Sequence, residues 1–169
     1  MKILSIDAET NGLWGKAFAI GAVLYENGKE IKTFLARCPI NGRVDKWVSE
    51  NVLPQLENIK ITHVSYGHML HEFSKFYLDN KVNSETIVHM GVPVEARLFL
   101  DAHACGYIGD WDAPYPLIDI SAFPEIGISV DSYNQMKKIN VPLESGGTHN
   151  PLYDARATAL AYMHLKAKK

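Results

Sequence analysis

Apolar and polar positions in the first forty residues form three short strand-like runs separated by turn residues. The runs cover residues 2–8, 17–25 and 30–37 and are rich in Ile, Leu, Val and Ala. The sequence ENGK at positions 26–29, between the second and third runs, is typical of a tight hairpin turn. The chain is therefore predicted to open with a three-stranded antiparallel meander.

After position 43 the apolar residues recur at helical spacing, with short apolar runs between the helical stretches. This pattern predicts helices over 44–56 (with a kink or boundary at Pro54), 66–80, 93–105, 132–139 and 151–165, the last capped by Asn150. It also predicts short strands over 86–89 and 116–121. Strands followed by helices that alternate with strands are typical of an α/β fold, with helices on the faces of a mixed sheet.

Composition narrows the class of protein. The chain has 169 residues, with 17 Lys and Arg against 19 Asp and Glu and a net charge of −2, and its pI is near 6.4. This balance excludes a protein that holds nucleic acid by bulk positive charge, but not one that holds phosphate through metal ions. No internal repeat or flexible linker interrupts the pattern, so residues 1–169 are predicted to form one domain.

The sequence also suggests where the protein works. No apolar run approaches the roughly 18 residues that span a bilayer, and the acidic N-terminal stretch is unlike a secretory signal, so no membrane contact is expected. Cys38 and Cys105 are too few for a disulfide framework. We therefore expect a reduced, cytoplasmic setting.

The first candidate for chemistry is a pair of acids at the end of the first predicted strand. Asp7 and Glu9 are two residues apart, so both carboxylates point to the same face of the strand. Two like charges held this close need strong hydrogen bonds or cations, and oxygen-only ligands suit Mg²⁺ or Mn²⁺. The alternative is that Asp7 ends the strand and Glu9 is solvated.

The second candidate lies near the C-terminus. His149 precedes the last predicted helix, in a loop made flexible by two glycines, and Asp154 lies early in that helix, where its carboxylate can face the sheet. A histidine on such a loop is a candidate general base, because its ordinary pKa lies near neutrality. The alternative is a surface histidine near a helix cap, with Asp154 stabilising the N-terminal end of the helix.

Together the two clusters resemble a known family. The sequence DAETNGL at positions 7–13 is similar to the first motif of the DEDDh (DnaQ-like) 3′–5′ exonucleases, and His149 and Asp154 match the last motif of that family. The resemblance implies an RNase H-like α/β fold, with an antiparallel three-stranded meander followed by parallel strands and flanked by helices. It spans nearly the whole chain, because the motifs lie near its two ends.

The middle acid is where the chain departs from the family, which has an aspartate at the start of a helix after a short strand. Glu95 is the best-aligned acid, and its extra methylene sets the backbone farther from a metal. Asp101 is the rival, but six helical residues, about 600° of rotation, separate the two, so they cannot share a face. We prefer Glu95 on this geometry, although it could also be no more than a charge near a helix N-terminus. The buried stripe of this helix is predicted to be Leu98, Phe99, Ala102 and Cys105.

The resemblance implies that two Mg²⁺ or Mn²⁺ ions are held by Asp7, Glu9, Glu95 and Asp154, with His149 deprotonating the attacking water. Asp7 would contact both ions, Glu9 and Asp154 the ion that activates water, and Glu95 the other. Thr10 and Leu13 within the first motif, and Trp14 directly after it, are candidate substrate-binding residues. The Trp14 ring could stack on a terminal base, and core packing explains it equally well.

The expected activity is hydrolysis of the last phosphodiester bond at a single-stranded 3′ end, releasing a 5′-mononucleotide. The sequence leaves open whether the polymer is DNA or RNA. It also leaves open the oligomeric state, with a homodimer among the options. Two other functions stay as alternatives: a catalytically inactive RNase H-like module that binds nucleic acid or protein, and an endonuclease of the broader RNase H-like group.

Overall fold

A five-stranded mixed sheet forms the centre of the computed structural model, which describes residues 1–143 and 146–167. The strand order is β3-β2-β1-β4-β5. An antiparallel meander is made by β1 (Lys2–Thr10), β2 (Ala17–Glu26) and β3 (Lys29–Arg37), whereas β4 (Glu85–Val88) runs parallel to β1 and β5 (Leu117–Asp119) parallel to β4. The predicted meander followed by parallel strands is thus confirmed.

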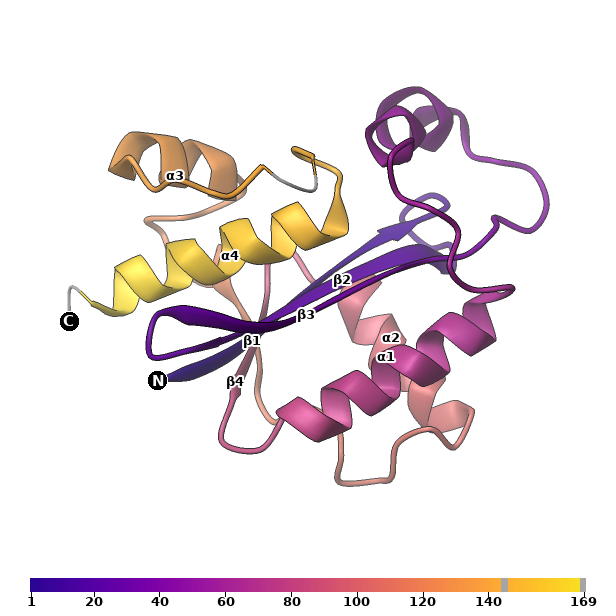
Figure 1. Ribbon diagram of the computed structural model, residues 1–169, viewed down its shortest axis with the longest axis horizontal. Helices are drawn as coiled ribbons and strands as arrows, with labels where there is room; N and C mark the ends of the chain where they lie inside the picture. The colour runs from indigo at the N-terminus through magenta and orange to yellow at the C-terminus, as the bar shows by residue number, and fades with distance from the viewer. Residues whose placement is uncertain (144–145, 168–169) are drawn as a thin grey trace.

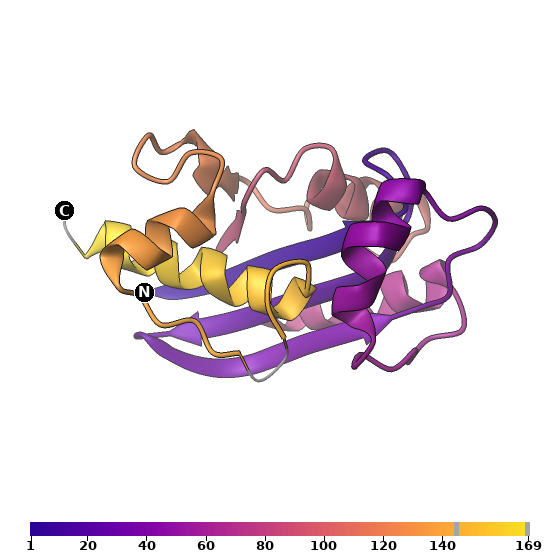
Figure 2. The same cartoon turned by 90° about the horizontal axis from the view of Figure 1, so that it is seen from above.

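Two helical layers cover the two faces of this sheet (Figure 1). One layer holds α1 (Tyr66–Asn80) and α2 (Val94–Ala104), and the other holds α3 (Val130–Lys137) and α4 (Pro151–Lys166). Seen from above, α4 lies along the sheet with α3 beside it (Figure 2). Helices on both faces explain why nearly all of β2 is buried.

The side-chain alternation of β1 assigns its residues to the two layers. Leu4, Ile6 and Ala8 belong to the apolar cluster under α1 and α2, whereas Ile3 belongs to the cluster under α3 and α4. Residues with odd numbers in β1 therefore face α4. Asp7 and Glu9 have odd numbers, so the strand directs both toward the helix that carries Asp154.

The start of α4 lies unusually close to the sheet. Asn150 caps the helix, since its Oδ1 accepts hydrogen bonds from the N–H groups of Leu152 and Tyr153 at 3.1 and 3.4 Å. Pro151 is the first helical residue, as predicted. A Cβ atom on Gly21 of β2 would stand 2.2 Å from the carbonyl carbon of Pro151. Only glycine leaves room for this contact between strand and helix.

Most predicted elements agree with the structure within two residues. The segment 44–56 holds two short helical turns, η1 (Val48–Val52) and η2 (Leu53–Leu56), and their border lies next to Pro54, where the sequence predicts a kink or boundary. Two other expectations are wrong. The last predicted strand, over 116–121, ends at Asp119, and a short helical turn, η3 (Ile120–Ala122), follows it. The strand ends there because the Asp119 carboxylate caps this turn by accepting a hydrogen bond from the Ser121 N–H. Cys105 is exposed and not part of the buried stripe, since α2 ends at Ala104.

Within residues 1–143 and 146–167, the helices lack the combination of length and apolar character needed to cross a membrane.

An ion pair between a buried arginine and a partly exposed glutamate joins α4 to the hairpin of β2 and β3. The guanidinium of Arg156, 8% exposed as a side chain, donates from Nη2 and Nε to the two oxygens of Glu30, 30% exposed, at 2.7 and 2.9 Å. We expect Glu30→Ala to lower the free energy of unfolding by about 2 kcal/mol, because the buried guanidinium then loses two charge-assisted hydrogen bonds. Urea denaturation measures the loss, with Glu26→Ala on the same hairpin as the exposed control. Equal stability of the two variants would contradict this role.

Candidate active site

The first strand delivers two carboxylates to one end of the sheet. Asp7 lies opposite Gly21 and Glu9 opposite Ala19 in the pairing of β1 with β2. On its other side, the pairing of β1 with β4 extends only to Ser5. The last residues of β1 therefore project beyond their parallel neighbour, which opens that edge to groups from other elements.

The last helix brings the third carboxylate to the same place. Asp154 is the fourth residue of α4, and its Oδ2 accepts a hydrogen bond from the His149 N–H at 2.8 Å. One carboxylate oxygen from each of Asp7, Glu9 and Asp154 lies within 4.8 Å of the others. Three acids from opposite ends of the chain thus form a cluster of the size and chemistry that can hold a cation.

Glu95 lies at the border of this cluster. It is the second residue of α2, only 3% exposed, and its Oε1 accepts a hydrogen bond from the Ala8 N–H at 2.8 Å, on the open edge of β1. It lines the same cavity as the three clustered acids but is outside their group. Asp101 points elsewhere, since its Oδ2 accepts a hydrogen bond from Tyr66 at 2.7 Å and pairs with Arg97 at 3.5 Å. The structure brings Glu95, and not Asp101, beside Asp7.

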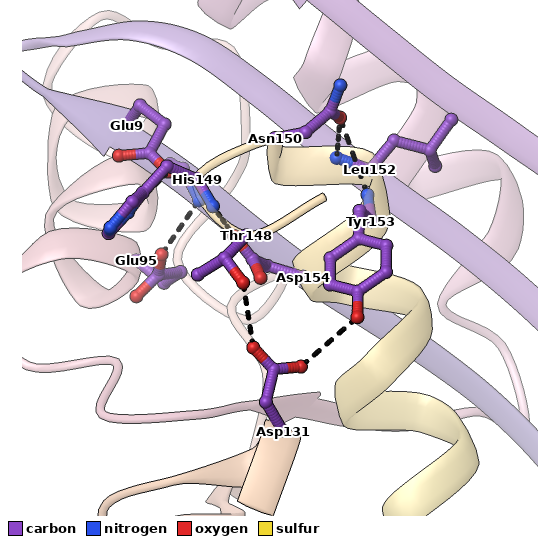
Figure 3. A network of polar contacts seen from close by, with 10 residues as sticks. Glu9, Glu95, Asp131, Thr148, His149, Asn150, Leu152, Tyr153 and Asp154 are labelled. Atoms are coloured by element: carbon purple, nitrogen blue, oxygen red, sulfur yellow. Dashed lines mark hydrogen bonds and ion pairs between the residues drawn. The ribbon is translucent and has the colours of Figure 1, made fainter. Parts of the chain in front are cut away.

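His149 stands over the cluster. Its Nδ1 lies 3.8 Å from Oε1 of Glu9, and its ring meets the Trp47 ring edge-on, with 5.4 Å between centroids. Figure 3 shows His149 between Glu9 and Asp154, with Glu95 nearby. The backbone of His149 has a φ of 68°, in the left-handed region that residues with a Cβ seldom adopt. Local contacts must hold it there.

The acids and His149 line a cavity of about 350 Å³, which is also lined by Met90, Ile128 and Thr148. Thr10, Leu13 and Trp14 are not among the described lining residues. Leu13 and Trp14 are 61% and 73% exposed, on a loop held by a hydrogen bond from Arg97 Nη1 to the Trp14 carbonyl oxygen at 2.8 Å. Core packing therefore does not account for Trp14.

The acidic groups of the site are costly to ionise together. Burial, and next the charge of Asp154, raise the pKa of Asp7 well above its ordinary value. Burial and the charge of Glu9 raise the pKa of Asp154 to about 8, and burial raises that of Glu95 to about 8. The nearby Glu9 carboxylate raises the pKa of His149, because it stabilises the protonated ring. Cations placed among the acids would offset these costs.

Burial and repulsion among the acids should make the stability of the metal-free protein depend on pH. The folded-state pKa of Asp154 exceeds its ordinary value of 3.8, so the folded state holds a proton that the unfolded state loses between about pH 4 and 8. Stability should fall as pH rises through this range. Asp154→Asn should raise the free energy of unfolding at pH 8 in EDTA by about 1–3 kcal/mol and flatten the pH profile. Thermal denaturation at pH 5 and 8 checks this, and Asp79→Asn, an exposed acid on α1, is the control.

No protein-family model matches the chain, and no curated protein sequence does. Among solved structures, it is similar to exonuclease X in complex with 5′-overhanging duplex DNA, with a TM-score of 0.65, 18% identity, and coverage of 99% of this chain and 92% of that chain. The fold is RNase H-like. At 18% identity this likeness concerns the fold alone, because one fold can carry many activities.

Two residues that support the site carry no clear signal in the sequence. Asp119 accepts hydrogen bonds from the N–H groups of Met90 and Gly91 at 3.0 and 2.9 Å, and thereby fixes the loop that leads into α2 and Glu95. Trp47 meets His149 across about one hundred residues of chain. Neither contact follows from spacing, because each depends on how distant segments come together.

Proposed function

We propose that the protein is a metal-dependent 3′–5′ exonuclease that hydrolyses phosphodiester bonds at single-stranded 3′ ends and releases 5′-mononucleotides. The observation that carries the proposal is the convergence of Asp7, Glu9 and Asp154 within 4.8 Å, with His149 beside them. The likeness of the fold to an exonuclease solved with DNA supports it.

The residues present fit divalent metal ions. The donors are all carboxylate oxygens, which Mg²⁺ and Mn²⁺ prefer over zinc. Within residues 1–143 and 146–167, no lysine or arginine forms an ion pair with Asp7, Glu9 or Asp154. Burial raises the pKa values of all three, and the charges of neighbouring acids raise those of Asp7 and Asp154 further. We propose that these three acids hold two ions together with Glu95. Glu95 would need to turn from the Ala8 N–H or to act through a water molecule.

In the proposed reaction the chain supplies a proton acceptor and a fixed geometry. Bound divalent ions would stabilise the negative charge that develops on the attacking and leaving oxygens. His149 accepts a proton from the attacking water at a ring nitrogen, and the Glu9 carboxylate stabilises the imidazolium that results. The water oxygen forms a bond to phosphorus, and the bond to the 3′ oxygen of the preceding nucleotide breaks. The terminal nucleotide leaves with its 5′ phosphate, and the shortened strand keeps a 3′ hydroxyl.

The proposed substrate contacts follow Glu9 along the chain. Thr10 ends β1 directly after Glu9, and the exposed side chains of Leu13 and Trp14 follow on the next loop. An exposed indole can stack on any base, and such stacking contributes about 1–3 kcal/mol. We propose that these three residues position the terminal nucleotides. The cytoplasmic location and the single domain over 1–169 stay predictions from the sequence, and a homodimer stays one of the open options for the oligomeric state.

The test is hydrolysis of end-labelled oligonucleotides. We expect 5′-labelled single strands of DNA or RNA to shorten stepwise from the 3′ end with Mg²⁺ or Mn²⁺, and to stay intact in EDTA. A duplex with 5′ overhangs, the kind of DNA bound in the exonuclease X structure, tests whether a recessed 3′ end is also accepted. Cleavage of a circular single strand would show an endonuclease, and cleavage from the 5′ end would refute the direction.

A catalytically inactive binding module is the second candidate, and one contact favours it. The Glu95 carboxylate is engaged by the Ala8 N–H, in a position where the related family has a shorter aspartate. This candidate predicts binding of oligonucleotides without any metal-dependent release of nucleotides, even with Mn²⁺. The same assay therefore separates the two functions.

A further inference from the structure

Asp131 connects the two halves of the site without belonging to the acidic cluster. It lies in the first turn of α3, and its two carboxylate oxygens accept hydrogen bonds from the Thr148 hydroxyl at 2.9 Å and the Tyr153 hydroxyl at 3.3 Å (Figure 3). Thr148 directly precedes His149, and Tyr153 directly precedes Asp154. The Asp131 carboxylate thus holds the residue before His149 and the residue before Asp154.

These contacts form a closed ring. From Asp131 the ring runs through Thr148 to His149, whose N–H donates to Asp154 at 2.8 Å, and returns through Tyr153. His149 is a member of this ring, and its φ of 68° is unfavourable for a side chain with a Cβ. The ring therefore accounts for how His149 keeps this backbone conformation.

The helix that carries Asp131 is fixed on α4. The Asn134 side chain donates from Nδ2 to the Ala157 carbonyl oxygen at 3.0 Å in a buried contact, and Tyr133 lies 2.9 Å from Nδ1 of His164. Ser129 caps the start of α3 by accepting from the Ser132 N–H at 3.2 Å. Asp131 is therefore held rigidly with respect to the helix that presents Asp154.

We propose that Asp131 is a positioning residue that fixes His149 and Asp154 relative to each other through its hydrogen bonds with Thr148 and Tyr153. Its effect on catalysis rests on the proposed function, whereas its effect on the backbone of His149 does not. This role is assigned to the two hydrogen bonds of Asp131. A side-chain amide can take the place of the carboxylate in both, because a hydroxyl can donate or accept. Asp131→Asn keeps a partner for each hydroxyl, whereas Asp131→Ala removes both.

The experiment compares these two variants with the full-length chain and with Asp79→Ala, which removes an exposed acid from α1. Hydrogen exchange of the His149 amide, in metal-free protein, should be about tenfold faster in Asp131→Ala and close to the parent in Asp131→Asn and Asp79→Ala. With a single-stranded substrate, kcat should fall about 10–100-fold in Asp131→Ala with little change in KM, and Asp131→Asn should restore most of it. Adding Thr148→Val to Asp131→Ala should change the exchange rate and kcat little further, since both substitutions remove the same hydrogen bond.

Several results would overturn the proposal. Unchanged exchange at His149 in Asp131→Ala would show that the ring does not hold this backbone, whether or not the protein hydrolyses nucleic acid. An Asp131→Asn variant as impaired as Asp131→Ala would show that charge is what matters. If Asp131→Ala loses cooperative thermal unfolding, Thr148→Val and Tyr153→Phe replace it, and unchanged exchange in both would refute the ring. An inactive parent protein with the expected exchange pattern would refute the proposed function and keep the positioning role.

Discussion

Asp7→Ala is expected to abolish metal-dependent release of nucleotides while the protein stays folded. Asp7 is the acid whose pKa responds to the charges of Asp154, Glu95 and Glu9 together, which places it at the electrostatic centre of the site. Without it the remaining acids cannot hold the proposed pair of ions. A loss of at least about 1,000-fold in kcat corresponds to about 4 kcal/mol of transition-state stabilisation, within the range of metal catalysis. End-labelled single strands with Mn²⁺ measure it.

The fold should be insensitive to this change, because the core on both faces of the sheet does not depend on the Asp7 carboxylate. In EDTA the variant should melt at or above the temperature of the parent protein, since a buried like charge is removed. Asp101→Asn is the matched control for the choice of ligands, because its carboxylate faces Tyr66 and Arg97 and not the cavity. Hydrolysis that persists in Asp7→Ala, or is lost only in Asp101→Asn, would contradict the metal assignment.

His149→Ala is expected to lower turnover by about 10²–10⁴-fold with metal binding mostly retained. The imidazole lies beside the three clustered acids, 3.8 Å from Glu9, and its side chain is outside the group that can share a cation. Turnover should therefore fall without a matching loss of metal binding. Turnover is measured on a single-stranded substrate, and metal binding by calorimetric titration with Mn²⁺.

An exposed histidine supplies the control for this prediction. His103 pairs with Asp110 at 2.8 Å on the surface of α2, so His103→Ala removes the same side chain away from the cavity. Its turnover should match that of the parent protein. Loss of cooperative unfolding in His149→Ala, with turnover and stability falling together, would indicate a structural histidine instead of a general base.

The order of elements could be predicted from the sequence because it depends on local pattern. The period of two in 2–8 placed Asp7 and Glu9 on one face, and the cap at Asn150 located the start of the last helix. The segment 44–56 was predicted in part. Its apolar spacing suits a helix with a boundary at Pro54, and the chain forms the two short turns η1 and η2, whose border lies next to that proline.

The details of the site were less accessible from the sequence. The hydrogen bond between Glu95 and the Ala8 N–H exists because β4 pairs with β1 only as far as Ser5, which no local pattern shows. The contact of Asp131 with Thr148 likewise depends on how α3 docks on α4. Residue types indicate the chemistry, whereas the positions of supporting groups follow from tertiary packing.

The contact between Gly21 and Pro151 sets how far apart the two halves of the acidic cluster lie. Gly21 is the register partner of Asp7, and Pro151 opens the helix that carries Asp154 three residues later. A single added methyl group at position 21 would lift the whole helix and spread the carboxylates beyond a shared coordination sphere. The chain can therefore lose the proposed ion-binding geometry through a residue that has no functional group, although every acidic residue is retained in the sequence.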